Sequence, residues 1–224
     1  MDYNPGANTS WAWRRICHVK NIYKDFLFNS DGTPKLQHYS MKERYWWVTR
    51  DNEPVEWWPW MQNRWITPKH QYTVWLIAHQ RLLTRARLAH LNLINETNCC
   101  ICDDGLENVD HLFFKCRFSK LIMDEIGEWS GIQLPKDDCI KWWLRYRARS
   151  ATKKKMMGII IAASIYEIWY ARNIARLELS VTHPKIVRKR IQNVVMRRID
   201  SLEIETNCPS IRGWTERLKM DGTD

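Results

Sequence analysis

The sequence is poor in the residues and motifs that mark several protein classes. Glycine and proline number only eight each among 224 residues, which excludes collagen-like and low-complexity chains. There is no G-x-x-x-x-G-K-[ST] phosphate loop, no G-x-G-x-x-G dinucleotide motif and no G-x-S-x-G nucleophile motif. These absences predict a protein that is not an enzyme and that has no small-molecule substrate.

A long hydrophobic run and a secretion signal are also missing. The longest apolar run, residues 156–166, contains Gly158 and Ser164, and it is shorter than the roughly 20 residues that a membrane-spanning helix needs. The first residues have neither the basic nor the apolar part of a signal peptide. Seven cysteines, an odd number, do not suit a disulfide framework. We therefore expect an intracellular protein that does not enter a membrane.

Positive charge is abundant and localised. The net charge is +10, and residues 141–198 hold fifteen Lys and Arg against two acids, Glu167 and Glu178. A localised positive field attracts polyanions, although a solvated helical surface is an alternative interpretation. We expect RNA or DNA to contact Lys153, Lys154, Lys155, Arg188, Lys189 and Arg190, and also Arg81, Arg85 and Arg87. The first two of these basic runs are weak nuclear-import patterns and favour the nucleus over the cytoplasm.

Tryptophan is the other abundant residue, with fourteen copies. Six of them fall in a segment rich in turn residues, namely Trp46, Trp47, Trp57, Trp58, Trp60 and Trp65. We expect these side chains to fill the core, because buried aromatic side chains contribute strongly to core packing. A stacking platform for nucleic-acid bases is the alternative. Within this segment, residues 40–48 are a candidate helix.

Apolar periodicity predicts a mainly α-helical fold with little or no sheet. Thr67 and Pro68 suit the N-cap and first position of a helix. The apolar face expected after them comprises Tyr72, Trp75, Leu76, His79, Leu82, Leu83 and Ala86. Further helices are expected from about residue 109 to Gly131, over 152–179, and from residues 182–184 to about residue 202.

Residues 99–116 carry the pattern that indicates the most specific chemistry. Their spacing is C-x2-C-x8-H-x4-C, formed by Cys99, Cys102, His111 and Cys116. Three thiolates and one imidazole suit a tetrahedral zinc ion, and two cysteines separated by two residues can share one ion within a tight turn. Gly105 provides the backbone freedom to reverse the chain. The sequence therefore predicts a small zinc-binding loop within the helical domain.

Protein would fill every position around this zinc, so we expect a structural ion without a water nucleophile. Cys100 is an alternative to Cys99, although C-x-C is a poorer turn, and His90 is a rival ligand. Free buried cysteines beside a surface histidine are the remaining alternative. We divide the chain into a Trp-rich N-terminal part, a zinc-binding core, a basic helical part and a polar tail, over residues 1–65, 66–130, 131–205 and 206–224.

Several sequence blocks between residues 11 and 180 occur in a recognisable order. They are WAWRRIC (11–17), YSMK (39–42), WITPKH (65–70), RLLTRARL (81–88), the Cys–His block with Glu107 (99–116) and IYEIWYARN (165–173). In this order they resemble the reverse-transcriptase zinc-binding domain near the C-terminus of plant LINE-type (non-LTR) retrotransposon polyproteins. The resemblance implies a domain that supports RNA or DNA handling beside a polymerase, with zinc on Cys99, Cys102, His111 and Cys116.

The polymerase activity itself is not implied. A polymerase palm needs a Tyr/Phe-x-Asp-Asp strand to hold two metal ions, and the nearest strings, residues 101–104 and 135–138, lack the aromatic residue. A ribonuclease H-like domain is also missing. We expect a non-catalytic nucleic-acid-binding module of retrotransposon origin. The alternatives are a zinc-stabilised scaffold that binds a protein partner, a relic without retained activity, and an enzyme remnant with residual nuclease activity.

Overall fold

The chain divides into two compact units, residues 1–53 and 54–224. The computed structural model describes residues 9–10, 12–19, 57–132, 151–202, 213–216 and 218. In the first unit, residues 12–19 form a helix on which Cys17 is buried. In the second unit, the described residues are mainly helical, and their extended segments pair only in a single β-bridge, Asn98–Leu106. The prediction of a mainly α-helical fold with little or no sheet is confirmed.

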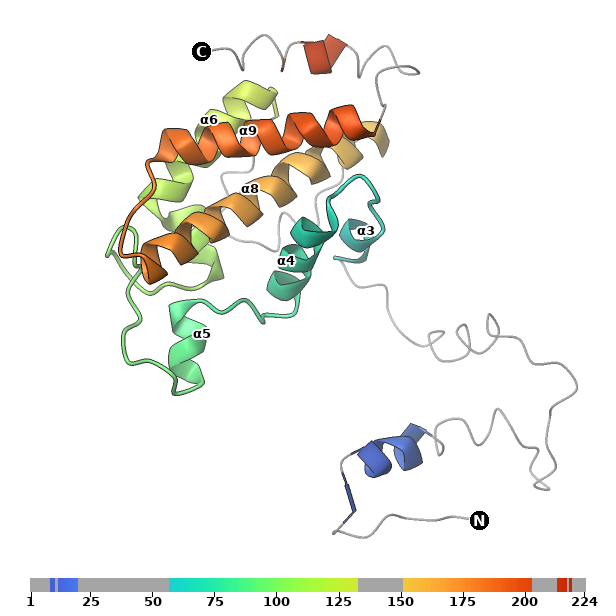
Figure 1. Cartoon of the computed structure of the whole chain (residues 1–224), viewed down its shortest axis with the longest axis vertical. Helices are drawn as coiled ribbons and strands as arrows, with labels where there is room; N and C mark the ends of the chain where they lie inside the picture. Colours follow the sequence, from blue (N-terminus) through green and yellow to red (C-terminus); the bar gives the residue numbers. More distant parts are fainter. Residues whose placement is uncertain are drawn as a thin grey trace, which may run out of the picture. The chain divides into compact units, whose positions relative to one another are not determined.

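The second unit is organised around one long central helix, α8 (Figure 1). The bounds of its described helices are α3 Trp58–Met61, α4 Pro68–Ala78, α5 Arg85–His90, the π-helix η1 His111–Lys115, α6 Arg117–Ser130, α8 Ala151–Leu177 and α9 Pro184–Ser201. Helix α8 packs against both α4 and α9, and α9 packs against α6. Helices α8 and α9 run antiparallel to each other (Figure 1).

Hydrophobic patterning explains why α8 is central and α9 is peripheral. Residues 156–165 of α8 are all buried, as expected for a helix that is apolar on every side. In contrast, α9 buries one stripe at four-residue spacing, formed by Val187, Ile191, Val195 and Ile199, and leaves its other side to solvent. Among the described residues, no helix combines the length and the apolar character needed to cross a membrane.

Two of the expected helix boundaries lie at residues whose local chemistry favours a helix start or a helix end. Helix α9 begins at Pro184, and the side chain of His183 accepts a hydrogen bond from Lys185 N at 3.2 Å. Helix α6 ends at Gly131, which adopts the left-handed φ of 63° that favours glycine after a helix. The predictions of these two boundaries are confirmed.

The single apolar face predicted after Pro68 is wrong, because two helices occupy this segment. Helix α4 stops at Ala78, Gln80 adopts a left-handed φ of 54°, and Thr84 starts α5 by accepting a hydrogen bond from Arg87 N. Tyr72 and Leu83 are consequently 60% and 48% exposed. The side chains that α4 buries are His70, Thr73, Val74 and Ile77.

The expected burial of tryptophan is confirmed at Trp60 and wrong at Trp58, which is 43% exposed. Trp65 is partly buried against the core, and Trp57 is half-buried. Trp46, Trp47 and the candidate helix over 40–48 lie outside the described residues.

The core of the second unit also includes residues from outside the predicted zinc-binding and basic helical parts. The division of the chain after residues 65, 130 and 205 stays a prediction. Helix α3, which we placed in the N-terminal part, packs against α4 within the second unit. At the other end, Leu218 of the expected polar tail is 1% exposed and joins the hydrophobic core. Its carbonyl oxygen accepts a hydrogen bond from Trp129 Nε1 at 3.2 Å, and Trp214 Nε1 donates to Ser130 O at 2.8 Å. The last described residues therefore dock on α6.

His70 makes the contact between α4 and α8 sensitive to acid. It is 1% exposed, its ring lies 4.8 Å from that of Tyr166, and its Nε2 has no hydrogen-bond partner. Burial, and then the charges of Lys69 and Arg198, lower the pKa of His70 from 6.5 to about 4. The folded chain therefore holds this imidazole neutral at pH values where the unfolded chain protonates it.

Replacement of His70 by phenylalanine is expected to flatten the acid dependence of stability. The unfolded state binds more protons between pH 6.5 and pH 4, so the free energy of unfolding falls as the pH drops through this window. At about 1.36 kcal/mol per pKa unit, the loss reaches about 3 kcal/mol. Urea unfolding of the wild type and of His70→Phe from pH 7 to pH 4 measures this contribution. Other acid-sensitive groups titrate in both proteins, so their effect on the free energy of unfolding cancels in the comparison. An equal pH dependence in the two proteins would contradict this role of His70.

Candidate metal centre

The loop that carries the first two cysteines of the pattern is a tight reversal of the chain. Cys99 N donates to Gly105 O at 3.0 Å, and Asp103 N donates to Cys99 O at 2.9 Å. Asp103 and Gly105 adopt left-handed φ values of 53° and 72°, and the latter is a conformation that glycine tolerates at little cost. This reversal brings the Sγ atoms of Cys99 and Cys102 within 4.8 Å of each other.

A single π-helical turn places the other two residues of the pattern. Cys116 N donates to His111 O at 2.8 Å, and Asn108 Oδ1 accepts from His111 N at 2.7 Å to start the turn. On an α-helix, residues five apart would point about 140° away from each other. The wider π-turn reduces this angle, so His111 and Cys116 can face one ion. The helix that we predicted from residue 109 is consequently interrupted at Cys116, and α6 begins only after it.

The four predicted ligands come together in the structure. One donor atom from each of Cys99, Cys102, His111 and Cys116 lies within 4.8 Å of the other three. Cys99 Sγ is 3.9 Å from Cys116 Sγ, and Cys102 Sγ is 3.3 Å from His111 Nε2. A tetrahedral ion with Zn–S bonds of about 2.3 Å separates its sulfur ligands by about 3.8 Å. This group could therefore hold zinc, both in donor chemistry and in spacing.

The environment of the thiols also suits a metal site. Cys99 and Cys116 are 0% and 1% exposed, and Cys102 is half-buried. The Sγ atoms of Cys99 and Cys116 share a hydrogen bond, which lowers the pKa of Cys99 to about 5 and raises that of Cys116. The thiolate form binds metal, so Cys99 is favourably prepared for this role.

Neither alternative ligand joins the group. Cys100 Sγ donates instead to Glu107 Oε2 at 3.5 Å and to Arg172 O at 3.7 Å. Burial, followed by the Glu107 carboxylate, raises the pKa of Cys100 to about 11, which keeps it a thiol. His90 lies on α5 with an exposed side chain and is not among the four grouped residues.

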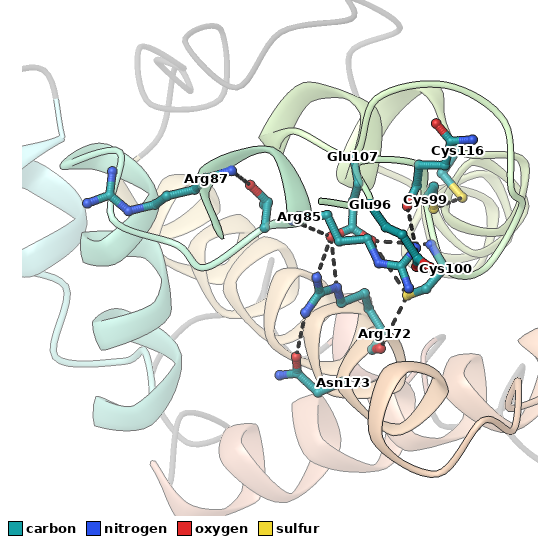
Figure 2. A network of polar contacts seen from close by, with 11 residues as sticks. Arg85, Arg87, Glu96, Cys99, Cys100, Glu107, Cys116, Arg172 and Asn173 are labelled. Atoms are coloured by element: carbon teal, nitrogen blue, oxygen red, sulfur yellow. Dashed lines mark hydrogen bonds and ion pairs between the residues drawn. The ribbon is translucent and has the colours of Figure 1, made fainter. Parts of the chain in front are cut away.

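A buried ion pair ties the metal loop to the central helix (Figure 2). Glu107 of the loop and Arg172 of α8 are both fully buried. Arg172 donates to Glu107 Oε1 from Nε at 2.9 Å and from Nη2 at 2.5 Å. In the sequence, Glu107 and Arg172 stand in two separate blocks, residues 99–116 and 165–173. Their 65-residue separation gives no local signal that they are partners.

Two of the arginines predicted to contact nucleic acid also belong to this part of the fold (Figure 2). Arg85 donates from its backbone N to Glu107 Oε1 and from Nη1 to Asn98 O, each at 2.9 Å. Arg87 Nη1 donates to Gln80 O at 2.6 Å. Arg81 is exposed, and its guanidinium lies 5.9 Å from the Trp75 ring. Arg85 and Arg87 thus have structural partners, whereas Arg81 faces solvent.

The other predicted nucleic-acid contacts lie on α8 and α9 and not at the metal centre. Lys153 and Lys155 are exposed near the start of α8, and Lys154 is half-buried beside them. On α9, Lys189 and Arg190 are exposed. Arg188 is half-buried, with Nε 3.5 Å from Glu125 Oε2 of α6.

A comparison with curated proteins and with solved structures found no match. A comparison with protein-family models found one match, which covers less than half of the chain and ends within α6. It includes Glu107 and all four residues of the metal group, and it excludes α8, α9 and Arg172. The metal centre of this chain lies in a segment, residues 39–122, that matches the family described as zinc-binding in reverse transcriptase.

Proposed function

We propose that this chain is a non-catalytic, zinc-stabilised module that binds RNA or DNA, derived from the C-terminal region of a plant LINE-type retrotransposon polyprotein. The family match supports an origin in a reverse transcriptase, and the sequence blocks described above supply the retrotransposon type. The observation that carries nucleic-acid binding is the basic outer side of α9. The basic runs at residues 153–155 and 188–190 support the proposal of a nuclear location.

Helix α9 separates its apolar and basic residues. Its buried stripe fixes it against the core, whereas Lys185, Lys189, Arg190 and Arg197 are exposed to solvent. Asp200 is the one acidic residue of the helix. Lysine and arginine ordered on a rigid helix can neutralise successive phosphates and release their counterions. This is the electrostatic pattern expected for contact with a polyanion.

Aromatic rings lie beside two of the basic side chains, one on α9 and one on α8. The Arg190 guanidinium lies 5.7 Å from the ring of Tyr170, which is 42% exposed on α8. Lys155 Nζ lies 5.1 Å from the Trp65 ring. Basic residues interleaved with accessible aromatic rings are typical of single-stranded nucleic-acid binding, in which bases stack and phosphates pair with cations.

The role of zinc in this proposal is structural. The bound ion would crosslink the loop of Cys99 and Cys102 to the π-turn of His111 and Cys116. Four protein ligands leave no position for a water nucleophile, so the site would support no hydrolysis. Glu107 would transmit this order to α8 through Arg172. The zinc site would thus stabilise the helices that present the basic residues.

Salt-dependent binding tests this function directly. We expect the zinc-loaded protein to bind a labelled single-stranded RNA, with a log–log slope of affinity against salt of several units. Each phosphate contact contributes about 0.7 to that slope on a single strand. Lys189→Gln should therefore reduce the slope by about 0.7, as measured by fluorescence anisotropy across a salt series.

Lys120→Gln is the matched control for this experiment. Lys120 is also an exposed helical lysine, but it lies one turn before Asp124 on the mixed-charge side of α6. The control should leave the slope unchanged. Absence of binding at low salt, or equal effects of the two variants, would contradict nucleic-acid binding through α9.

A protein-docking scaffold is the second candidate function, and exposed apolar residues at the α8–α9 connection favour it. Leu177 and Leu179 are 77% and 91% exposed, and Val181 and Ile186 are about half exposed. An apolar cluster of this kind is typical of protein contact sites. Self-association that does not depend on salt, without RNA binding, would favour this candidate over the first.

A further inference from the structure

A pocket lies between the α3 segment and the first turns of α8. Its volume is about 290 Å³, just below the range of about 300–1,000 Å³ that is usual for ligand sites. Pro59 and Trp60 line it from α3, and Met157 and Gly158 line it from α8. Gln62, Asn63, Lys154 and Lys155 complete the lining. The pocket is separate from the metal centre and is lined by two of the lysines that we expect to contact nucleic acid.

The α3 side of this pocket is held rigidly. Gln71 Nε2 donates to the carbonyl oxygens of Trp60, Met61 and Asn63 at 3.3, 3.3 and 2.9 Å. Asn63 Nδ2 donates to Lys155 O at 3.2 Å and so connects this segment to α8. A Cβ at Gly158 would lie 2.5 Å from Asn63 Nδ2, so glycine permits this close approach. The pocket is therefore preformed, which reduces the cost of ordering it around a ligand.

The lining combines three chemistries that one nucleotide requires. Pro59, which is exposed, and the accessible edges of the buried Trp60 and Met157 supply an apolar wall for a flat aromatic base. Gln62 has an exposed side-chain amide, which can both donate to and accept from the edge of a base. Lys154 and Lys155 supply positive charge for a phosphate. A purely apolar ligand would not require the amide and the two ammonium groups, and a simple anion would not require the apolar wall.

We propose that this pocket takes one nucleotide of a bound single strand, with its base against Pro59 and the accessible edge of Trp60 and its phosphate beside Lys154 and Lys155. This inference rests on the proposed function and adds a base-binding position to the phosphate contacts of α9. Because the amide of Gln62 can rotate to suit different bases, the pocket discriminates weakly between sequences. It does discriminate between a strand with bases and a strand without them.

The test compares two labelled strands that carry the same phosphates. One is a twelve-nucleotide oligothymidylate, and the other is a twelve-unit strand of abasic tetrahydrofuran sites. Base–aromatic stacking corresponds to a factor of about five or more in affinity. We expect the zinc-loaded protein to prefer the thymidylate strand by at least this factor at each salt concentration, with equal salt slopes for the two strands.

Trp60→Leu locates the effect, and Trp58→Leu is its matched control. Trp58 lies on the same short helix, is 43% exposed and does not line the pocket. We expect Trp60→Leu to reduce the preference to nearly one and Trp58→Leu to preserve it. Trp60 is largely buried, so ultraviolet crosslinking of the thymidylate strand to the wild-type protein provides a measurement without a variant. Mass spectrometry should map crosslinks to residues 59–63 or 154–158.

The outcomes separate this inference from the proposed function. Equal affinity for the two strands, with a retained salt slope, would overturn base binding in the pocket. It would leave phosphate binding by α9 intact. Crosslinks confined to other segments, or a preference preserved in folded Trp60→Leu, would also overturn base binding in the pocket. Failure of both strands to bind at low salt would overturn the pocket and the proposed function together.

Discussion

Replacement of Cys99 by serine is expected to abolish zinc binding, whereas replacement of its neighbour Cys100 by serine is expected to preserve it. Cys99 Sγ belongs to the four-residue group, but Cys100 Sγ points to Glu107 and Arg172. Structural zinc contributes about 10–16 kcal/mol in small zinc-finger peptides, which is comparable to the total stability of a typical domain, about 5–15 kcal/mol. Loss of the ion should therefore lower the helix content as well.

Metal analysis and circular dichroism of the same samples check this prediction. Wild type and Cys100→Ser should each carry one zinc per chain with full helicity. Cys102→Ser and His111→Ala should lose zinc and helicity together, as Cys99→Ser does. If Cys100→Ser lost the ion and Cys99→Ser retained it, the ligand assignment would be wrong at this position. Unchanged metal content in Cys102→Ser and His111→Ala would refute the whole site.

Truncation of Glu107 to alanine is expected to be the most destabilising change outside the metal ligands. Arg172 is fully buried and donates twice to the Glu107 carboxylate. Removal of one partner from a buried ion pair leaves the other charge uncompensated and typically costs about 3–5 kcal/mol. The same carboxylate accepts hydrogen bonds from Arg85 N and Cys100 N, so these donors would lose their partner as well. Urea unfolding of the zinc-loaded protein measures the loss.

Glu96→Ala is the matched control, because Glu96 also pairs with an arginine. Its side chain is 81% exposed, and its carboxylate lies 3.5 Å from Arg85 Nη1. Exposed pairs contribute less than about 1 kcal/mol. A double variant, Glu107→Leu with Arg172→Met, should recover much of the stability lost in Glu107→Ala, since it leaves no unpaired charge. Equal unfolding free energies for Glu107→Ala and Glu96→Ala would contradict the importance of the buried pair.

This ion pair gives a physical route from the metal centre to the basic surface. Glu107 lies in the metal loop, Arg172 lies on α8, and α8 packs along α9. Loosening of the loop after zinc loss would therefore remove the charge partner of Arg172 within the core. Zinc removal should weaken RNA binding indirectly, although no zinc ligand is expected to touch RNA.

Local chemistry made several features predictable from the sequence. Proline at the first position of α9 and glycine after α6 fix the ends of these helices without help from distant residues. The C-x2-C-x8-H-x4-C spacing identified the four grouped residues, because the geometry of a shared ion constrains the spacing of its ligands. Apolar periodicity predicted α8 and α9 well because both helices contribute long stretches to one core.

Features that depend on tertiary contacts were not predictable in the same way. The apolar residues after Pro68 fit a single helix, but the turn at Gln80 divides them between α4 and α5. The π-turn at His111 arises from hydrogen bonding that no residue pattern specifies. The docking of Leu218 on α6 and the pairing of Glu107 with Arg172 join segments far apart in the chain. Local propensity carries no information on such pairings.

The most direct test of the zinc site is X-ray absorption spectroscopy of the purified protein at the zinc edge. We predict one zinc per chain with three sulfur ligands at about 2.3 Å and one nitrogen ligand at about 2.0–2.1 Å. Such a spectrum would establish a closed site made by Cys99, Cys102, His111 and Cys116. A spectrum with an oxygen ligand from water, with fewer than three sulfur ligands, or with no zinc would contradict a closed structural site.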